Sequence, residues 1–201
     1  MSQYIKISAV ISIHNEERQL ADCLETLNFA DEIIVLLDKC SDRSEEIARM
    51  FTDRVVRGEW KTEGQRRNAG INECTGSWVF EIDADERVPD DLARELQVVV
   101  SSTTADWHEI PVDNYVGERL VRYGWGASFG KAAYPGLFRK GSKVWGDQRV
   151  HPVLRWSGVK GEMLKTHGSN KKLKKFFGNI KFTNLNKGID QTIQKFKRFN
   201  I

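Results

Sequence analysis

The sequence of 201 residues has few cysteines and no long hydrophobic run, and each absence excludes a class of protein. Its three cysteines, Cys23, Cys40 and Cys74, are widely spaced and form no CxxC pair. We therefore expect neither a disulfide framework nor a zinc cluster. No apolar stretch approaches the roughly 20 residues of a membrane-spanning helix. The N-terminal residues MSQYIKISAVISI lack the charged segment and long apolar run of a signal peptide, so the sequence predicts a cytoplasmic protein.

Familiar phosphate-binding and metal-binding motifs are also missing. The segment GWGASFGKA (124–132) resembles a phosphate-binding loop, but its glycine spacing does not fit GxxxxGK. Ala132 also takes the place of the Ser or Thr that would bind magnesium. No GxGxxG follows the first predicted strand, which disfavours a dinucleotide-binding fold. The four histidines show no metal-ligand spacing.

Charge is divided unevenly between the two halves of the chain. Residues 1–100 hold 12 Lys and Arg against 21 Asp and Glu, whereas residues 101–201 hold 19 against 7. Residues 160–201 alone carry 11 basic and 2 acidic residues. This uneven distribution of charge indicates that the second half binds an anionic partner, such as phosphate groups, lipid head groups or nucleic acid.

Strand-like and helix-like segments alternate through the first hundred residues. Apolar runs predict strands at 4–13, 32–38, 54–58 and 77–83. Helical periodicity or helix-start signals predict helices at 16–29, 42–51, 63–74 and 88–100. This alternation is typical of an α/β fold with a mostly parallel sheet and helices on both faces. Later segments at 106–117, 136–145 and 148–156 predict strands that form a hairpin or antiparallel additions.

Polar clusters follow three of the predicted strands. They are HNEE (14–17), DKCSD (38–42) and DADE (83–86). Because parallel strands all point the same way, these clusters are expected at one edge of the sheet. Ligands of such sheets bind beyond that edge, so the clusters predict a binding site.

Asp83 and Asp85 are the strongest candidates for metal ligands. They are two residues apart, so in extended backbone their carboxylates face the same side. Two carboxylates with open positions suit Mg²⁺ or Mn²⁺ shared with a diphosphate. The alternative is an acidic loop without a ligand, and Asp90 and Asp91 are interpreted only as residues of a helix's first turn. Because the other two polar clusters are expected at the same sheet edge, the metal-site interpretation is favoured over the acidic loop.

Other charged residues near this edge have two interpretations. Asp38 follows a buried strand, where it could accept a hydrogen bond from a ribose hydroxyl or a base N–H. Its alternative is a turn or N-cap role, for which Asp42 is the better candidate. Glu17 is more typical of the first turn of the following helix. Arg66 and Arg67, taken singly, are more typical of solvated surface charges.

Four motifs follow one another at specific spacing: HNEE, D-x-x-S-D-x-S (38–44), RNxG (67–70) and DADE. With them, the chain resembles family 2 glycosyltransferases of the GT-A fold over roughly residues 4–170. It is most similar to the bacterial group that adds a β-linked glucose to the inner core of lipopolysaccharide. That group also has an LFR-like segment and an R-x-VH motif, which LFRK (137–140) and QRVHP (148–152) match.

The resemblance implies inverting transfer of a sugar from a nucleotide-diphosphate donor, usually linked to UDP. Asp38 would contact the uracil or the ribose, Asp83 would approach the ribose, and Asp85 would bind the metal and the diphosphate. The metal, Mg²⁺ or Mn²⁺, would be held by Asp85 and Asp83 and would offset charge on the leaving diphosphate. The implied nucleotide-sugar site comprises His14, Asn15, Glu16, Asp38, Arg67, Asn68, Asp83, Ala84 and Asp85.

The sequence departs from the family pattern at two places. The related group usually has Glu after the VH pair, and this chain has Pro152. Inversion needs a base that deprotonates the acceptor hydroxyl, and the candidates are Asp147 first and His151 second. His14 stands where the family more often has Tyr, which alters the stacking of the base.

The chain is therefore interpreted as one domain with a tail. Residues 1–100 form the nucleotide-sugar-binding half, 101–165 the acceptor-binding half, and 166–201 a basic amphipathic helical tail. The tail fits a peripheral enzyme on the cytoplasmic face of a bacterial inner membrane, with a lipid-linked glycan acceptor. Its alternative is that the charges simply solvate the outer face of packed helices.

Two other functions remain open from the residues alone. A sugar-phosphate nucleotidyltransferase would need a Gly-rich, Arg-containing loop after the first strand, and SIHNEERQ (12–19) has no glycine. A nucleic-acid-binding module could use the Lys-rich tail, but it would leave DADE unexplained and the tail lacks a recognised motif. We expect no nucleic-acid partner.

Overall fold

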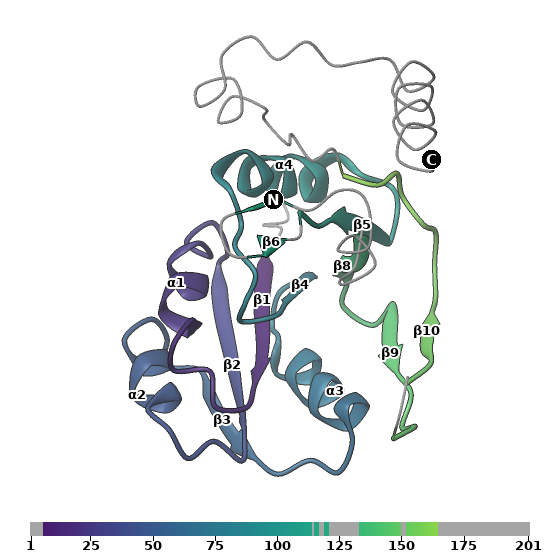
Figure 1. Cartoon of the computed structure of the whole chain (residues 1–201). Coiled ribbons are helices and arrows are strands. Elements are labelled where there is room, and N and C mark those ends of the chain that lie inside the picture. The colour runs from purple at the N-terminus through teal and green to yellow at the C-terminus, as the bar shows by residue number, and fades with distance from the viewer. Residues whose placement is uncertain (1–5, 114, 117–118, 121–132, 150–151, 165–201) are drawn as a thin grey trace, which may run out of the picture. The chain divides into compact units, whose positions relative to one another are not determined.

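A six-stranded mixed sheet forms the centre of the computed structural model, which describes residues 6–113, 115–116, 119–120, 133–149 and 152–164 (Figure 1). Its strand order is β3-β2-β1-β4-β8-β5. β1, β2, β3 and β4 are parallel, and β8 runs antiparallel between β4 and β5. The strands are β1 (Ile7–Ile13), β2 (Glu32–Asp38), β3 (Val55–Gly58), β4 (Trp78–Ile82), β5 (Trp107–Pro111) and β8 (Ala133–Arg139).

Helices cover both faces of this sheet (Figure 1). α1, α2 and α4 pack on one face and α3 on the other, because their apolar residues belong to two separate buried clusters. The helices are α1 (Leu20–Glu25), α2 (Ser44–Arg49), α3 (Glu63–Glu73) and α4 (Asp90–Ser102). Two small antiparallel pairs complete the described fold: β6 (Tyr115–Val116) with β7 (Arg119–Leu120), and β9 (Lys143–Trp145) with β10 (Leu154–Trp156).

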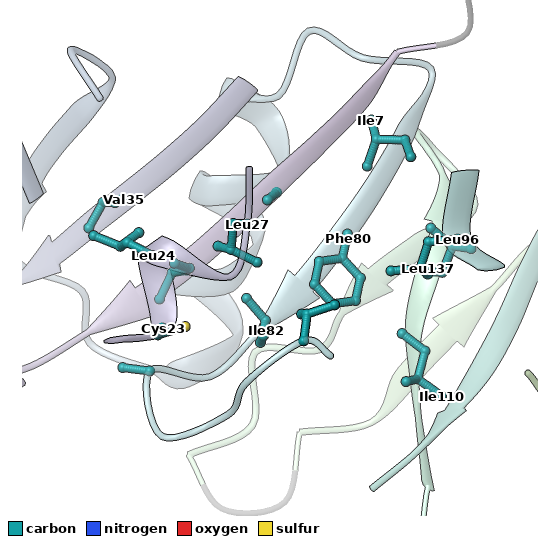
Figure 2. Close-up of a cluster of buried hydrophobic side chains, with 14 of the residues drawn as sticks. Ile7, Cys23, Leu24, Leu27, Val35, Phe80, Ile82, Leu96, Ile110 and Leu137 are labelled. Atoms are coloured by element: carbon teal, nitrogen blue, oxygen red, sulfur yellow. The ribbon is translucent and has the colours of Figure 1, made fainter. Parts of the chain in front are cut away.

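The two clusters follow from the alternation of side chains along each strand. In β1, Ile11 contributes to the larger cluster and its neighbour Val10 to the smaller one. Figure 2 shows the larger cluster, to which Leu24 of α1, Phe80 of β4 and Leu96 of α4 all belong. Burial on both faces explains why these strands read as nearly continuous apolar runs.

The predicted fold class is confirmed, with differences at the ends of elements. The strand expected at 32–38 has those bounds, whereas the helix expected at 16–29 covers only Leu20–Glu25. The strand expected at 106–117 ends at Pro111. The antiparallel additions are also confirmed, although β8 joins the main sheet and β9 pairs with β10 instead.

The basic tail predicted at 166–201 lies outside the described residues and stays a prediction. Among the residues that the structure describes, no helix is both long enough and apolar enough to cross a membrane.

Candidate active site

The three polar clusters lie at the carboxyl edge of neighbouring parallel strands, as the sequence predicts. β1 lies between β2 and β4 and is parallel to both, with Ile13 beside Leu37 and Ile11 beside Ile82. The loops that follow these three strands therefore leave the sheet at the same edge. This is where an open parallel sheet binds its ligands.

Hydrogen bonds hold the first two loops together. His14 Nδ1 lies 2.6 Å from the backbone oxygen of Asp38. Asn15 Oδ1 accepts hydrogen bonds from the amides of Ser41 and Asp42, at 2.8 and 3.3 Å. Asn15 and Lys39 both have positive φ angles, 57° and 52°. Non-glycine residues adopt this conformation rarely, and such positions are frequent at functional sites.

A pocket of about 380 Å³ opens beside the loop that follows β1. α1 begins only at Leu20, so Glu17 belongs to this loop and not to the first turn of a helix, which corrects the sequence interpretation. The amide of Glu17 donates to Asp42 Oδ2 at 3.0 Å, and the amide of Glu16 donates to Ser44 Oγ at 2.9 Å. The pocket is lined by Asn15, Glu16, Glu17, Arg18, Gln19 and Asp42.

Asp38 ends β2 and has two partners at the sheet edge. Its Oδ1 accepts from the amide of Trp60 at 3.2 Å, and its Oδ2 lies 3.4 Å from Arg66 Nη1. The Arg66 side chain is only 19% exposed, so the expectation of a solvated surface charge is wrong for it. The expected contact of Asp38 with the nucleoside stays a prediction.

The DADE segment forms a turn after β4, which corrects the expectation of extended backbone. β4 ends at Ile82, and the oxygen of Asp83 accepts from the amide of Glu86 at 3.0 Å. Glu86 Oε2 in return accepts from the amide of Asp83 at 3.2 Å. Ala84 is buried at 5% exposure, whereas Asp85 is exposed. The turn therefore presents Asp85 to solvent while Asp83 stays near the end of the strand.

Glu86 of this turn contacts Tyr134 of β8. Burial raises the pKa of the Glu86 carboxyl, and the charge of Asp83 beside it acts in the same direction. The hydroxyl of Tyr134 bonds to Glu86, and burial together with that carboxylate raises the pKa of Tyr134. Glu86 is thus tied to the turn itself through the amide of Asp83.

Arg67 is the centre of a network of charges that sequence analysis missed. Its guanidinium contacts Glu63 and Glu81 at 2.8 Å each and Asp83 at 2.9 Å, and the side chain is only 11% exposed. Burial alone would lower the pKa of Arg67, but Glu81 and Asp83 raise it above the ordinary value. The surface interpretation of Arg67 is therefore wrong.

Glu81 lies inside β4, and its burial is unexpected because it is a charged residue. It is 4% exposed, and Lys143 Nζ of β9 lies 2.6 Å from its Oε2. Burial alone would raise the pKa of Glu81, but Lys143 and Arg67 hold it below the ordinary value. The only signal in the sequence is one acid within the apolar run WVFEI. Its partner follows 62 residues later.

Asn68 connects α3 to β9. Its Nδ2 donates to the oxygen of Trp145 at 2.8 Å, and its Oδ1 accepts from the amide of Trp145 at 2.9 Å. The two bonds imitate the pairing of a neighbouring strand. In the described residues Asn68 thus serves to dock β9, and its expected place in the nucleotide pocket stays a prediction.

The structure describes Asp147, one of the two residues expected to act as the catalytic base. Asp147 is exposed, and its Oδ1 accepts from Thr62 Oγ1 at 2.7 Å. Thr62 is also the N-cap of α3, because its Oγ1 accepts from the amide of Gln65. Asp147 therefore lies beside the positive end of the α3 dipole. His151 lies outside the described residues.

The donor set of the acidic turn fits a hard divalent cation. Within the described part of the chain, no group of three His, Cys, Asp or Glu residues could hold a metal ion unaided. Mg²⁺ is commonly held by one or two carboxylates together with substrate phosphates, which matches Asp83 and the exposed Asp85. The residues therefore suit an ion that binds together with a diphosphate.

Several solved glycosyltransferase structures are similar to this chain. Staphylococcus aureus TarS (1–349) in complex with UDP-GlcNAc matches with a TM-score of 0.49 and 19% identity, over 58% of this chain and 37% of that chain. Glucosyl-3-phosphoglycerate synthase from Mycobacterium tuberculosis, in complex with Mg²⁺ and UDP, matches with a TM-score of 0.45 and 22% identity. That match covers 53% of this chain and 43% of the other.

Curated relatives are similar over half of the chain or slightly more. The uncharacterized glycosyltransferase RT0209 of Rickettsia typhi is 29% identical over 102 residues, which are 50% of this chain and 35% of the relative. The lipopolysaccharide core biosynthesis glycosyltransferase LpsC of Rhizobium meliloti is 26% identical over 123 residues, or 59% of this chain and 42% of that protein. The chain thus spans less than half the length of either relative. The model of Glycosyl transferase family 2 matches residues 8–153, and the chain belongs to that family.

Proposed function

We propose that the chain transfers a sugar from a nucleotide-diphosphate donor, with inversion, to a lipid-linked glycan. One observation carries the donor part: the loops after β1, β2 and β4 bring Asn15, Asp38 and Asp85 to a single sheet edge. An edge with a pocket, a half-buried carboxylate and an exposed carboxylate suits a nucleoside at one end and a metal diphosphate at the other.

The donor that we propose is UDP-glucose. Asp38 would exchange its long contact with Arg66 for a hydrogen bond from the uracil or ribose, with His14 and Glu16 beside the nucleoside. Asp85, with Asp83, would hold Mg²⁺ or Mn²⁺ on the diphosphate. When bound, the ion would supply Lewis-acid stabilisation of the leaving diphosphate.

Asp147 is our proposed base. Its carboxylate is exposed to solvent, and the Thr62 hydroxyl bonds to one of its oxygens, which orients the other. A base of this kind would take the proton of the acceptor hydroxyl as the sugar transfers. His151 is the second candidate, and Asp147→Asn against His151→Gln in a transfer assay separates the two.

The acceptor that we propose is a lipopolysaccharide core or another lipid-linked glycan, met at the cytoplasmic face of the inner membrane. Similarity to LpsC, a lipopolysaccharide core biosynthesis glycosyltransferase, supports the class of acceptor. The 11 basic residues among 160–201 support peripheral binding to an anionic surface.

The proposal is tested by calorimetric titration with UDP-glucose, UDP-GlcNAc, UDP-galactose and GDP-mannose, each with and without Mn²⁺. We expect binding of uridine donors, strengthened by Mn²⁺, with UDP-glucose the tightest. If no nucleotide sugar binds in either condition, the proposed function is wrong. A preference for GDP-mannose would refute the uridine assignment alone.

A further inference from the structure

A buried group of charges joins the strand that precedes the acidic turn to β9. Glu81 of β4 and Lys143 of β9 are 4% and 3% exposed, and their charged atoms are 2.6 Å apart. Arg67 Nη1 and Trp145 Nε1 approach the same carboxylate, at 2.8 and 3.3 Å. A carboxylate removed from water is costly unless cations and donors surround it. Three donors converge here, so the position of Glu81 is closely fixed.

Arg67 transmits this fixed position to the acidic turn. Glu81 and Asp83 are two residues apart, and the fork of Arg67 bonds to both, with Nη1 on Glu81 and Nη2 on Asp83. Its Nε donates to Glu63 at 2.8 Å, and its Cζ lies 4.9 Å from the centre of the Trp145 ring. A planar guanidinium with its donors occupied on three sides has little freedom to rotate. Asp83 therefore has a defined partner before any ligand binds.

Lys143 determines how much of Arg67's charge remains for Asp83. Among the cations that the structure describes, only Arg67 would contact Glu81 without Lys143, and Arg67 would be drawn toward that buried carboxylate. With Lys143 present, Glu81 is already paired, and Arg67 can bond to Glu81 and Asp83 together. Stability alone does not require this arrangement, because a buried ion pair can often be replaced by neutral side chains of similar size.

We propose that Glu81 and Lys143 are positioning residues that, through Arg67, orient the carboxylate of Asp83 for the metal-bound diphosphate of the donor. This inference rests on the proposed function. It assigns to β9 a part in donor binding, although β9 belongs to the half of the domain expected to bind the acceptor. Neither residue touches the donor in this account.

The test uses the double variant Glu81→Gln/Lys143→Met, which removes both charges and keeps the volumes and the charge balance. UDP-glucose affinity is measured by calorimetry with and without Mn²⁺. We expect the Mn²⁺-dependent gain in affinity to fall about tenfold or more, as for other residues that orient metal ligands, while metal-free affinity stays within about twofold. The matched control is Glu32→Gln, a buried carboxylate at the opposite end of the sheet, which should leave both affinities unchanged.

A second measurement needs no ligand. Nitrogen NMR of the Arg67 guanidinium should show slow rotation about Cζ–Nη in the wild type and fast rotation in the double variant. If the double variant loses its circular dichroism spectrum, both measurements are made on Lys143→Met alone, where Arg67 is drawn toward Glu81. The Mn²⁺-dependent gain should then fall as in the double variant, and rotation about Cζ–Nη2, the bond whose nitrogen is released from Asp83, should become fast.

The outcomes are distinguishable. A folded variant with unchanged Arg67 rotation, or with the full Mn²⁺-dependent gain, overturns the inference. Equal losses with and without Mn²⁺ also overturn it, because they indicate a purely structural role. A wild type that binds no nucleotide sugar refutes the proposed function instead, and the Arg67 rotation then tests only whether Glu81 and Lys143 hold Arg67 in place.

Discussion

Glu32 should make the stability of the fold depend on pH in the acid range. This carboxylate begins β2, at the end of the sheet away from the candidate active site, and its side chain is 8% exposed. Burial alone would raise its pKa, but hydrogen bonds from Ser8, Thr75 and Gly76 lower it from 4.5 to about 2. Arg54 lies 2.9 Å away and adds an ion pair.

The size of the effect follows from this pKa. The folded-state value lies below the unfolded one, so the contribution is complete above pH 4.5 and is lost as the pH falls from 4.5 through 2. The full shift corresponds to about 3 kcal/mol, of which about 1.4 kcal/mol would remain at pH 3. Arg54 is 38% exposed, and solvent screening reduces its share. We therefore expect about 1–2 kcal/mol to be lost between pH 7 and pH 3.

The assay is urea unfolding of the wild type and of Glu32→Gln at pH 7, 5, 4 and 3. The difference in unfolding free energy between them should shrink as the pH falls, because glutamine does not titrate. Glu25→Gln, at an exposed acid that ends α1, is the control. A difference for Glu32→Gln that stays constant over the whole range would refute the reasoning.

Three further substitutions test the packing. Phe80→Ala removes a ring that is 1% exposed in the larger core cluster, and urea unfolding should show a loss of about 3–5 kcal/mol; a loss below about 1 kcal/mol would contradict this. Gly64→Ala places a Cβ 1.8 Å from the oxygen of Gly146, directly after β9, so thermal unfolding should show a cost of about 1–3 kcal/mol. An unchanged midpoint would show that α3 is not packed against the backbone at Gly146. Asn68→Ala leaves the amide and the oxygen of Trp145 without their partner, so hydrogen exchange at that amide should accelerate. Unaltered protection of the amide would show that the Asn68 side chain does not bond to Trp145.

Local patterns predicted the sheet because its strands are contiguous and buried on both faces. The run EIIVLLD has no polar residue between its two acids, and β2 has those bounds. The sequence also predicted that the three polar clusters lie at one edge of the sheet, because this depends only on the strands being parallel. The helix bounds were less accurate, because hydrogen-bonded turns precede and follow α1, and Leu27 in the later turns keeps the helical spacing of the apolar residues.

The charge network could not be predicted because its members meet only in the folded chain. Arg67 looks like a surface residue when only its neighbours in sequence are considered. Its burial depends on Glu81, Asp83 and Trp145, which come from β4, the turn after it, and β9. The form of the acidic turn was missed for a different reason. β4 ends at Ile82, and the bond between the oxygen of Asp83 and the amide of Glu86 makes DADE a turn where extended backbone was expected.

The central claim is that the exposed carboxylate of the acidic turn binds a metal ion together with the donor. The most direct measurement is the affinity for UDP-glucose with and without Mn²⁺ in the wild type, Asp85→Ala and Asp90→Ala. Asp90, an exposed acid in the first turn of α4, is the matched control. We predict that Asp85→Ala loses the Mn²⁺-dependent gain in affinity, about tenfold or more and thus about 1.4 kcal/mol, while Asp90→Ala keeps it. Equal Mn²⁺-dependent binding by Asp85→Ala and the wild type would contradict the account.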